Sequence, residues 1–369
     1  MLSDKRSYIP VFEDADIESL HNLIKVAEVI TTISHVRPDG DAVGSSLGMY
    51  GYLESLGKDV KSIFPTAIPD NLLFLPKKEN ILIYDFAPKR SHKRIMESDL
   101  IICLDFNTPG RIEEAGESLR QSPAKKVLID HHLFPERDFF DLCFSTPETS
   151  STAELTYFIL LRMEEVAGDV SNLPLSSRRA LMTGMTTDTN NFANSTFPST
   201  LLMASDLIAS GVDREEIIQN FLLSYKEKRL RLVGVILKDL MKITPEGVAY
   251  YIIPHSLSKA YDIKEGDTEG IVNMPLSVKK VRMSISVKEE TSCFRISIRS
   301  KRGTSANAMA RKYFAGGGHE CAAGGKIFIG NAPSPEDIFI PDPSGIEEYV
   351  LSAIHEYFGN KFEGVEYDD

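Results

Sequence analysis

Ile33-Ser34-His35-Val36-Arg37-Pro38-Asp39-Gly40-Asp41-Ala42-Val43-Gly44-Ser45 is the stretch around which the N-terminal half of the chain is organised. It follows an apolar run at 29–33, which predicts a buried strand, and it leads into a predicted helix. Pro38 fixes one backbone angle and Gly40 can take a positive one, so the turn between strand and helix can fold back on itself. The turn carries one imidazole and two carboxylates, those of His35, Asp39 and Asp41. These side chains, aimed at one point, predict a metal site.

Two later apolar runs end in the same residue types. The run 99–104 stops at Asp105, and the run 126–129 stops at Asp130-His131-His132. In an open parallel sheet the ligand crevice lies outside the carboxyl ends of the strands, so these clusters are expected to converge there. For a lone Asp-Gly-Asp sequence the alternative is a polar surface loop in which Asp41 caps a helix. Three strand ends with similar ligands favour the metal site.

The joint pattern resembles the DHH phosphoesterase superfamily. Four motifs occur in the expected order: HVRPDGDAVGS at 35–45, LD at 104–105, DHH at 130–132, and Asp188 in GMTTDTNNF. The sequence Gly316-Gly317-Gly318-His319 in FAGGGHECAAGG resembles the signature of the DHH-associated C-terminal domain. The resemblance spans roughly residues 15 to 330, and the combination is more specific than any one motif. Within the superfamily, the length and the GGGH sequence point to the group of oligoribonucleases and phosphoadenosine-phosphate phosphatases.

The fold implied is α/β, with a mostly parallel sheet flanked by helices and a smaller α+β C-terminal domain. Alternation of apolar and polar residues at 281–288 and 294–299 predicts paired strands in the smaller domain. The expected divisions are a catalytic domain (1–203), a helical linker (204–241), a substrate-binding domain (242–345) and a C-terminal helix with an acidic tail (346–369).

Two local patterns each allow two interpretations. The glycines at 44, 48 and 51 share one ridge of a predicted helix, which permits close packing on the sheet, while Gly44 can also leave room for a ligand. The hydroxyls of Ser150-Ser151-Thr152 are expected to cap a helix, and a phosphate at that helix N-terminus is the alternative.

The resemblance implies two metal ions. One is held by His35, Asp39 and Asp105, and the other by Asp41, Asp105, His131 and Asp188. Asp105 therefore bridges the pair. Imidazoles and carboxylates without thiolates suit Mn²⁺, with Mg²⁺ or Co²⁺ as substitutes. Two such cations acidify a shared water and clamp a phosphoryl oxygen, as phosphoester hydrolysis requires.

Two further residues of the DHH motif are assigned catalytic roles. Asp130 is expected to orient the metal-binding cluster by accepting a hydrogen bond or by completing the surroundings of a ligand. His132 is expected to donate a hydrogen bond to the scissile phosphate. The alternative for His132 is a buried histidine that only fills space.

A second site is expected in the smaller domain, where consecutive glycines let backbone N–H groups approach an anion. Arg299 at a strand end can grip a phosphate with two parallel hydrogen bonds. The predicted substrate-binding residues are Arg299, Ser300, Gly316, Gly317, Gly318 and His319. A flexible turn is the alternative for the glycines alone.

Length, net charge and hydropathy limit the kinds of partner that the protein is expected to bind. The chain has 369 residues and a net charge of −12, which argues against a protein that coats long nucleic acid, including long duplexes. No apolar run approaches the roughly 20 residues needed to span a bilayer, and no signal segment is evident, so a cytoplasmic protein without membrane contact is expected. The sequence leaves open whether the chain forms a homodimer.

The expected activity is hydrolysis of short oligoribonucleotides to mononucleotides, with conversion of adenosine 3′,5′-bisphosphate to AMP as a companion. Cleavage of linear or cyclic dinucleotides is the alternative within the superfamily. Family II pyrophosphatases fit less well, because they have a different C-terminal domain without the GGGH sequence. A non-catalytic nucleotide-binding regulator is the alternative from another class, and the intact ligand set argues against it.

Overall fold

The computed structural model describes residues 10, 12–75, 80–263, 267–268, 270–334 and 337–359. The chain forms two compact units, Met1–Ser224 and Tyr225–Asp369. The division falls inside the range 204–241 that was predicted as a linker. The acidic tail lies outside the described residues.

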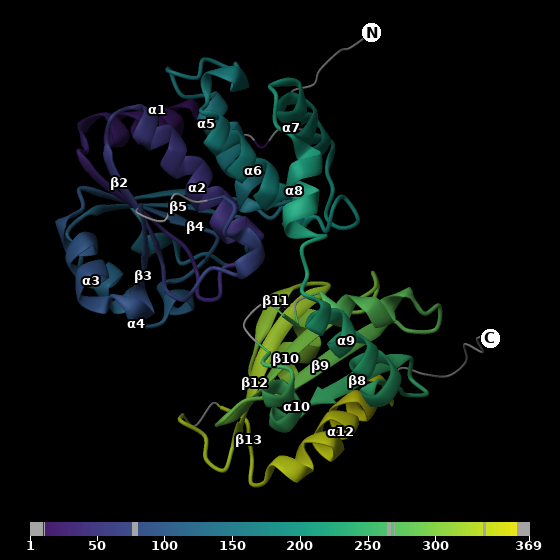
Figure 1. Ribbon diagram of the computed structural model, residues 1–369. Helices are drawn as coiled ribbons and strands as arrows, with labels where there is room; N and C mark the ends of the chain where they lie inside the picture. Colours follow the sequence, from purple (N-terminus) through teal and green to yellow (C-terminus); the bar gives the residue numbers. More distant parts are fainter. Residues whose placement is uncertain are drawn as a thin grey trace. The chain divides into compact units, whose positions relative to one another are not determined.

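The first unit is built on a parallel sheet with the strand order β3-β2-β1-β4-β5-β6 (Figure 1). The strands are β1 (Val29–Ile33), β2 (Asp59–Phe64), β3 (Ile81–Ile83), β4 (Leu100–Leu104), β5 (Lys125–Asp130) and β6 (Leu142–Ser145). Because β1, β4 and β5 are neighbours and parallel, their carboxyl ends lie side by side. The predicted α/β fold with a parallel sheet is confirmed.

Helices cover both faces of this sheet (Figure 1). The helices are α1 (Asp14–Val26), α2 (Gly40–Ser55), α3 (Pro88–Glu97), α4 (Glu114–Gln121), α5 (Thr152–Leu161), α6 (Leu175–Asp188), α7 (Pro198–Ala209) and α8 (Arg214–Phe221). On β4, Leu100 and Ile102 enter a core shared with α1, α2, α5 and α6, whereas Ile101 enters a core shared with α3 and α4. This alternation explains why β4 is apolar throughout, since both of its faces are buried.

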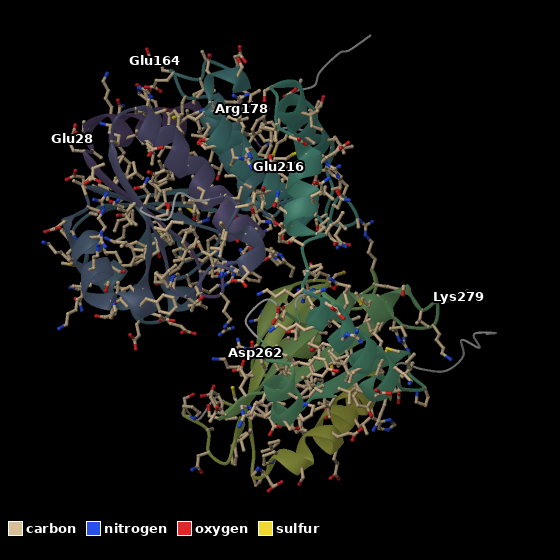
Figure 2. The ribbon with its side chains drawn as sticks, viewed as in Figure 1. Glu28, Glu164, Arg178, Glu216, Asp262 and Lys279 are labelled. Atoms are coloured by element: carbon tan, nitrogen blue, oxygen red, sulfur yellow. The ribbon has the colours of Figure 1, made fainter. Side chains whose placement is uncertain are left out.

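Two arginines hold α6, the helix that ends in Asp188. Arg178 donates to the carbonyl oxygen of Ser210, and Arg179 pairs with Glu216 of α8 at 2.7 Å. Figure 2 labels Arg178 and Glu216. These contacts fix α6 against the elements that follow it. Asp188 lies at the other end of the same helix.

The glycine ridge of α2 packs against α6, not against the sheet as the sequence suggested. A Cβ at Gly44 would lie 2.5 Å from the carbonyl oxygen of Ala180 and 2.6 Å from the backbone nitrogen of Gly184. A Cβ at Gly48 would lie 2.5 Å from Leu181. The space beside Gly44 is therefore filled by α6, and the interpretation as ligand space is wrong.

Gly44→Ala is expected to destabilise the first unit by about 1–3 kcal/mol, because the added methyl group meets backbone atoms that cannot rotate away. Urea unfolding followed by circular dichroism measures the change. Gly234→Ala in α9 (Glu227–Val235) is the matched control, since a Cβ there has nothing within 4 Å and alanine favours a helix. An unchanged unfolding midpoint for Gly44→Ala would contradict the close packing of α2 on α6.

The second unit contains a mainly antiparallel sheet in the order β11-β12-β10-β9-β8-β7, with β13 beside β12. The strands are β7 (Lys242–Ile243), β8 (Val248–Ile253), β9 (Met283–Glu289), β10 (Cys293–Ser300), β11 (Gly317–His319), β12 (Ala322–Ile329) and β13 (Phe339–Ile340). The helices are α9 (Glu227–Val235), α10 (His255–Ala260), α11 (Ala306–Tyr313) and α12 (Ile346–Gly359). Apolar residues of β9 and β10 face α11 and α12, which accounts for the two-residue alternation in the sequence.

Within the described residues, no helix combines the length and apolar character that crossing a bilayer requires.

Candidate metal centre

The turn after β1 delivers the first ligands. Asp39 is the N-cap of α2, and its Oδ1 accepts from the backbone N–H groups of Asp41 and Ala42, each at 3.0 Å. The positive backbone angle belongs to Arg37, with φ of 52°, and not to Gly40 as predicted. Gly40 begins the helix, and a Cβ there would collide with the side chain of Thr187. Glycine is needed at position 40 for close approach to α6.

His35 is oriented by its own backbone. Its Nδ1 lies 2.8 Å from the carbonyl oxygen of Val36, which leaves the Nε2 lone pair for a ligand. Nε2 lies 3.3 Å from Asp105 Oδ2 and 3.9 Å from Asp39 Oδ1. Burial lowers the pKa of His35. A neutral imidazole is the form that binds a metal.

Asp105 lies between two histidines. Its Oδ2 faces His35, while its Oδ1 lies 3.6 Å from Nε2 of His131. Asp105 has a φ of 65°, a left-handed conformation that is uncommon for a residue with a side chain and that occurs at functional sites. The two oxygens of one carboxylate thus point into two neighbouring ligand groups.

His131 belongs to the second group of ligands, together with Asp41, Asp105 and Asp188. Its Nε2 lies 3.8 Å from Asp41 Oδ2 and 3.7 Å from Asp188 Oδ2, in addition to its contact with Asp105. Burial lowers the pKa of His131, so this imidazole is also held neutral. The ligand atoms of two sets lie within 4.8 Å of one another: His35, Asp39 and Asp105, and Asp41, Asp105 and His131.

The carboxylates of the cluster are short of positive charge. Burial, followed by repulsion from neighbouring carboxylates, raises the pKa of both Asp41 and Asp105 well above the usual range. For Asp39, burial alone would raise the pKa, but His35 and the backbone N–H of Ala42 outweigh it and the pKa is lowered. Divalent cations would stabilise the ionised forms of these buried groups. The donor set and its charge therefore fit bound metal ions.

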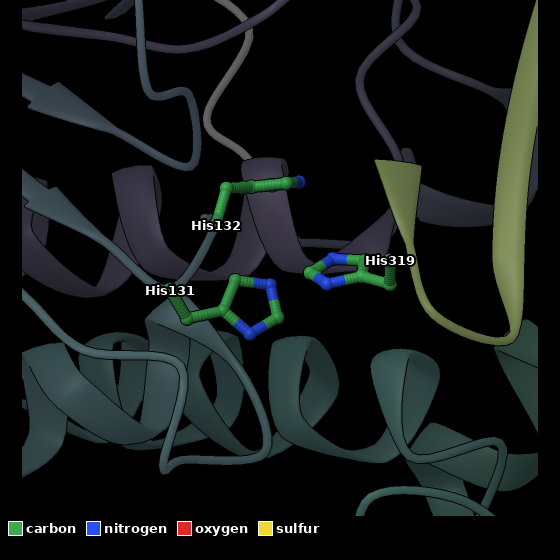
Figure 3. A group of neighbouring side chains, drawn as sticks. All are labelled: His131, His132 and His319. Carbon is green, nitrogen blue, oxygen red and sulfur yellow. The ribbon is translucent and has the colours of Figure 1, made fainter. Parts of the chain in front are cut away.

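The rest of the DHH motif lies beside this cluster. His132 Nδ1 lies 2.7 Å from Asp130 Oδ1. The rings of His131 and His132 are steeply inclined to each other (Figure 3), and their centroids are 4.9 Å apart. If Nδ1 donates to Asp130, Nε2 is the ring atom left to meet a phosphate. Asp105, Asp130 and His132 also have ligand atoms close enough to hold a cation.

The N-terminus of α5 supports the cluster in a way that the sequence did not reveal. The backbone N–H groups of Thr152 and Ala153 donate to the two oxygens of Asp41 at 2.7 and 2.8 Å. The hydroxyl of Thr152 donates to Asp105 Oδ1 at 3.0 Å. Ser151 is the N-cap, as expected. The helix N-terminus therefore binds a carboxylate of the protein, which leaves those N–H groups unavailable to a phosphate.

Arg111 is a second residue that sequence reasoning missed. It lies in the 3₁₀ turn Pro109–Ile112, six residues beyond Asp105, and its charge acts on His35, Asp39 and Asp105. In the part of the chain that the structure describes, its guanidinium makes no hydrogen bond and no ion pair. The sequence did contain a signal for this residue, because an arginine in the loop after Asp105 is placed to reach the predicted metal site.

In the second unit, Arg299 and His319 share one row of the sheet. Both residues pair with Ala322 of β12, one from each side, so their side chains emerge on the same face about 10 Å apart. Ser300 is buried, and its hydroxyl donates to the carbonyl oxygen of Thr304 at 2.6 Å. That contact gives Ser300 a structural role in the turn.

The expected glycine loop is a strand. Gly317, Gly318 and His319 form β11, which pairs with β12. A Cβ at Gly318 would lie 2.5 Å from the carbonyl oxygen of Ala322, and its φ is 150°. A Cβ at Gly316 would lie 2.6 Å from the Cα of Gly325. Close approach of the two strands accounts for these glycines.

An α/β sheet whose strand ends gather two neutral imidazoles and several buried carboxylates defines a class, the metal-dependent phosphoesterases. The chain belongs to the DHH family. The N-terminal domain of the DHH family matches residues 29–185, and the DHHA1 domain matches residues 247–333.

The chain is similar to three known proteins. The structure of an exopolyphosphatase-related protein from Bacteroides fragilis is 36% identical, with a TM-score of 0.84, and the match covers 94% of this chain and 97% of that one. The bifunctional oligoribonuclease and PAP phosphatase NrnA of Thermus thermophilus is 29% identical over 318 residues, which is 82% of this chain and 87% of that protein. The cyclic-di-AMP phosphodiesterase GdpP of Geobacillus thermodenitrificans is 25% identical over 360 residues, covering 92% of this chain and 49% of that protein.

Proposed function

We propose that the protein hydrolyses short oligoribonucleotides to mononucleotides, and adenosine 3′,5′-bisphosphate to AMP, with two Mn²⁺ ions. Mg²⁺ and Co²⁺ are expected to substitute. The observation that carries the proposal is Asp105, whose two carboxylate oxygens face His35 and His131 separately. The name of the relative from Thermus thermophilus supports the choice of substrate.

The ligands divide into two sets. One ion would be held by His35, Asp39 and Asp105, and the other by Asp41, Asp105, His131 and Asp188. Bound there, the cations would supply an acidified water as nucleophile and would neutralise charge on the phosphoryl group. The hydrogen bonds that Asp41 accepts from Thr152 and Ala153 fix its oxygens in place. Such fixed ligands need little rearrangement during the reaction.

Two side chains of the first unit would act on the phosphate itself. Asp130 holds the ring of His132 through Nδ1, which places Nε2 to donate to the developing negative charge. Arg111 offers a guanidinium that can bind a phosphate oxygen with parallel hydrogen bonds. These residues stabilise the transition state more than the ground state.

The second unit would bind the part of the substrate that does not react. Arg299 and His319 emerge on one face of the sheet, where a guanidinium and an imidazole can hold a phosphate or a base. Binding energy from that remote part positions the reacting phosphate.

The second candidate is cleavage of linear or cyclic dinucleotides. The resemblance to the GdpP relative favours it, and that relative is named a cyclic-di-AMP phosphodiesterase. Both candidates use the same metal centre, so they differ only in the preferred substrate.

A substrate panel tests the proposal. The Mn²⁺-loaded protein is incubated with adenylate dinucleotide, cyclic di-AMP, adenosine 3′,5′-bisphosphate, pyrophosphate, and RNA of graded length. A net charge of −12 offers no continuous basic track, so contacts are expected to stop after a few phosphates. We expect kcat/KM for two to five nucleotides to exceed that for a 24-mer by at least about tenfold, or about 1.4 kcal/mol.

The other outcomes separate the rivals. A flat or rising length profile would indicate a general exonuclease. Preference for cyclic di-AMP over the linear dinucleotide would favour the second candidate. Nucleotide binding without any turnover would indicate a regulator.

A further inference from the structure

Phe134 is an exposed aromatic residue in the loop that follows the DHH motif. It is 74% exposed, and it follows His132 by two residues. Two residues of extended chain span at most about 7 Å, so the Cα of Phe134 lies close to that of His132. Burial of an aromatic ring is strongly favourable, which makes an exposed ring beside a reactive site a candidate contact for a ligand.

The backbone holds this ring in a defined place. Phe134 has a φ of 59°, a conformation that is rare for a bulky residue. The loop is tied on both sides of Phe134 to Asn107, whose Nδ2 donates to the carbonyl oxygen of Leu133 at 2.7 Å and whose carbonyl oxygen accepts from Glu136 N at 2.9 Å. Asn107 itself follows Asp105 by two residues. The loops after β4 and β5 are therefore connected by these two hydrogen bonds, and Phe134 lies between the two bonded residues of the second loop.

Other aromatic rings near these strand ends are already engaged. Phe106 and Phe140 are buried. Phe139 packs edge-on against Phe140, and the guanidinium of Arg120 lies 5.5 Å from its ring centre. Among the described residues of the loops after β1, β4 and β5, Phe134 is thus the ring that presents most of its surface to a ligand.

The centre itself consists of carboxylates, imidazoles and one guanidinium, which suit a phosphate but offer nothing to the apolar face of a base. In a nucleotide, the base is joined to the phosphate through one ribose, so a ring a few ångströms from the phosphate site can reach it. Stacking of bases on aromatic side chains is the usual way in which proteins bind single-stranded nucleotides without sequence preference.

We propose that Phe134 forms a subsite for a nucleobase, on which the base adjoining the scissile phosphate stacks. The inference rests on the proposed function and extends it, because it assigns base recognition to the catalytic unit as well as to the second unit. Such a platform accepts any base, so the enzyme is expected to show little sequence preference at this position.

Kinetics with a matched pair of variants provides the first test. Phe134→Ala is expected to lower kcat/KM for adenylate dinucleotide at least about fivefold, and Phe134→Tyr is expected to retain wild-type values because its ring still stacks. Phe86 is the control, since it is 78% exposed but follows β3, the edge strand, two strands away from β1. Phe86→Ala should leave kcat/KM unchanged.

The absence of tryptophan from the sequence permits a direct test of binding. Phe134→Trp and Phe86→Trp each create a protein with a single tryptophan, whose fluorescence can be excited apart from that of the tyrosines. AMP, a product that is not hydrolysed further, is expected to quench the fluorescence of Phe134→Trp and not that of Phe86→Trp. Ribose 5-phosphate, which lacks the base, should quench neither.

Distinct results would overturn the inference and the proposed function. If wild-type protein cleaves the dinucleotide but Phe134→Ala is unimpaired and AMP does not quench Phe134→Trp, the base subsite is wrong and the proposed function stands. If wild-type protein cleaves no nucleotide, the proposed function fails and the inference fails with it. If Phe134→Ala changes the elution volume in size-exclusion chromatography, the ring contacts a second copy of the chain, and the subsite is again refuted.

Discussion

Asp105→Asn is expected to lower kcat/KM at least about a thousandfold, a loss of about 4 kcal/mol in transition-state stabilisation. The reason is that each oxygen of this carboxylate faces a different histidine, at 3.3 Å from His35 and 3.6 Å from His131. An amide offers one good acceptor in place of two and carries no charge, so both ligand groups are weakened together. Bound metal, measured by mass spectrometry of the purified protein, is expected to fall at both positions.

Asp99→Asn is the matched control, because Asp99 lies at the opposite end of β4. Its Oδ2 accepts from the backbone N–H groups of Glu28 and Val29, and an asparagine oxygen can accept from both. This variant changes the protein charge by the same amount, and we expect it to keep full metal content and activity. Two tightly bound metal ions in Asp105→Asn would refute the bridging role.

His132→Ala is expected to lower kcat by about a hundredfold to a thousandfold while metal content stays unchanged. Asp130 holds this ring through Nδ1 at 2.7 Å, so we assign Nε2 to the phosphate and not to a cation. KM should change little, since the contact strengthens mainly in the transition state. Steady-state kinetics and metal analysis of the same preparation separate these effects.

The geometry supplies a sharp alternative for His132. Its ring and the carboxylates of Asp105 and Asp130 lie close enough to ligate a cation. Loss of one metal equivalent in His132→Ala would show that the residue is a ligand. His21→Ala, which removes a histidine from α1 near Glu164, serves as the control for loss of an imidazole.

The metal-site residues that the sequence predicted were found from their place along the chain, directly after predicted strands. Asp105 and His131 each follow an apolar strand, and parallel strands bring their carboxyl ends to one edge. The fold class alone was therefore enough to predict that these side chains converge. Asp188 was located by its motif alone, and the packing of α6 on α2 is what delivers it.

The features that the sequence did not predict depend on contacts between distant segments. Thr152 donates hydrogen bonds to Asp41, which is 111 positions earlier in the chain, and to Asp105, which is 47 positions earlier. No local pattern distinguishes a helix start that makes such contacts from an ordinary one. No local pattern indicates the left-handed backbone of Asp105 either. The glycines of α2 were recognised as a close-packing ridge, but the partner helix could not be identified, because a small-residue ridge fits a sheet or a helix equally well.

In the second unit, the sequence predicted the paired strands and placed Arg299 at a strand end, as observed. The triple glycine was interpreted as a loop, since glycine is depleted in strands. Here Gly318 of β11 and the preceding Gly316 both lie too close to β12 for side chains, and this crowding is visible only in three dimensions.

The central claim is that two cations share the carboxylate of Asp105. Anomalous diffraction from crystals grown with Mn²⁺ tests it most directly. We predict two peaks, one among His35, Asp39 and Asp105 and one among Asp41, Asp105, His131 and Asp188, with Asp105 as a ligand of both. A single peak, or two peaks that do not share Asp105, would contradict the account.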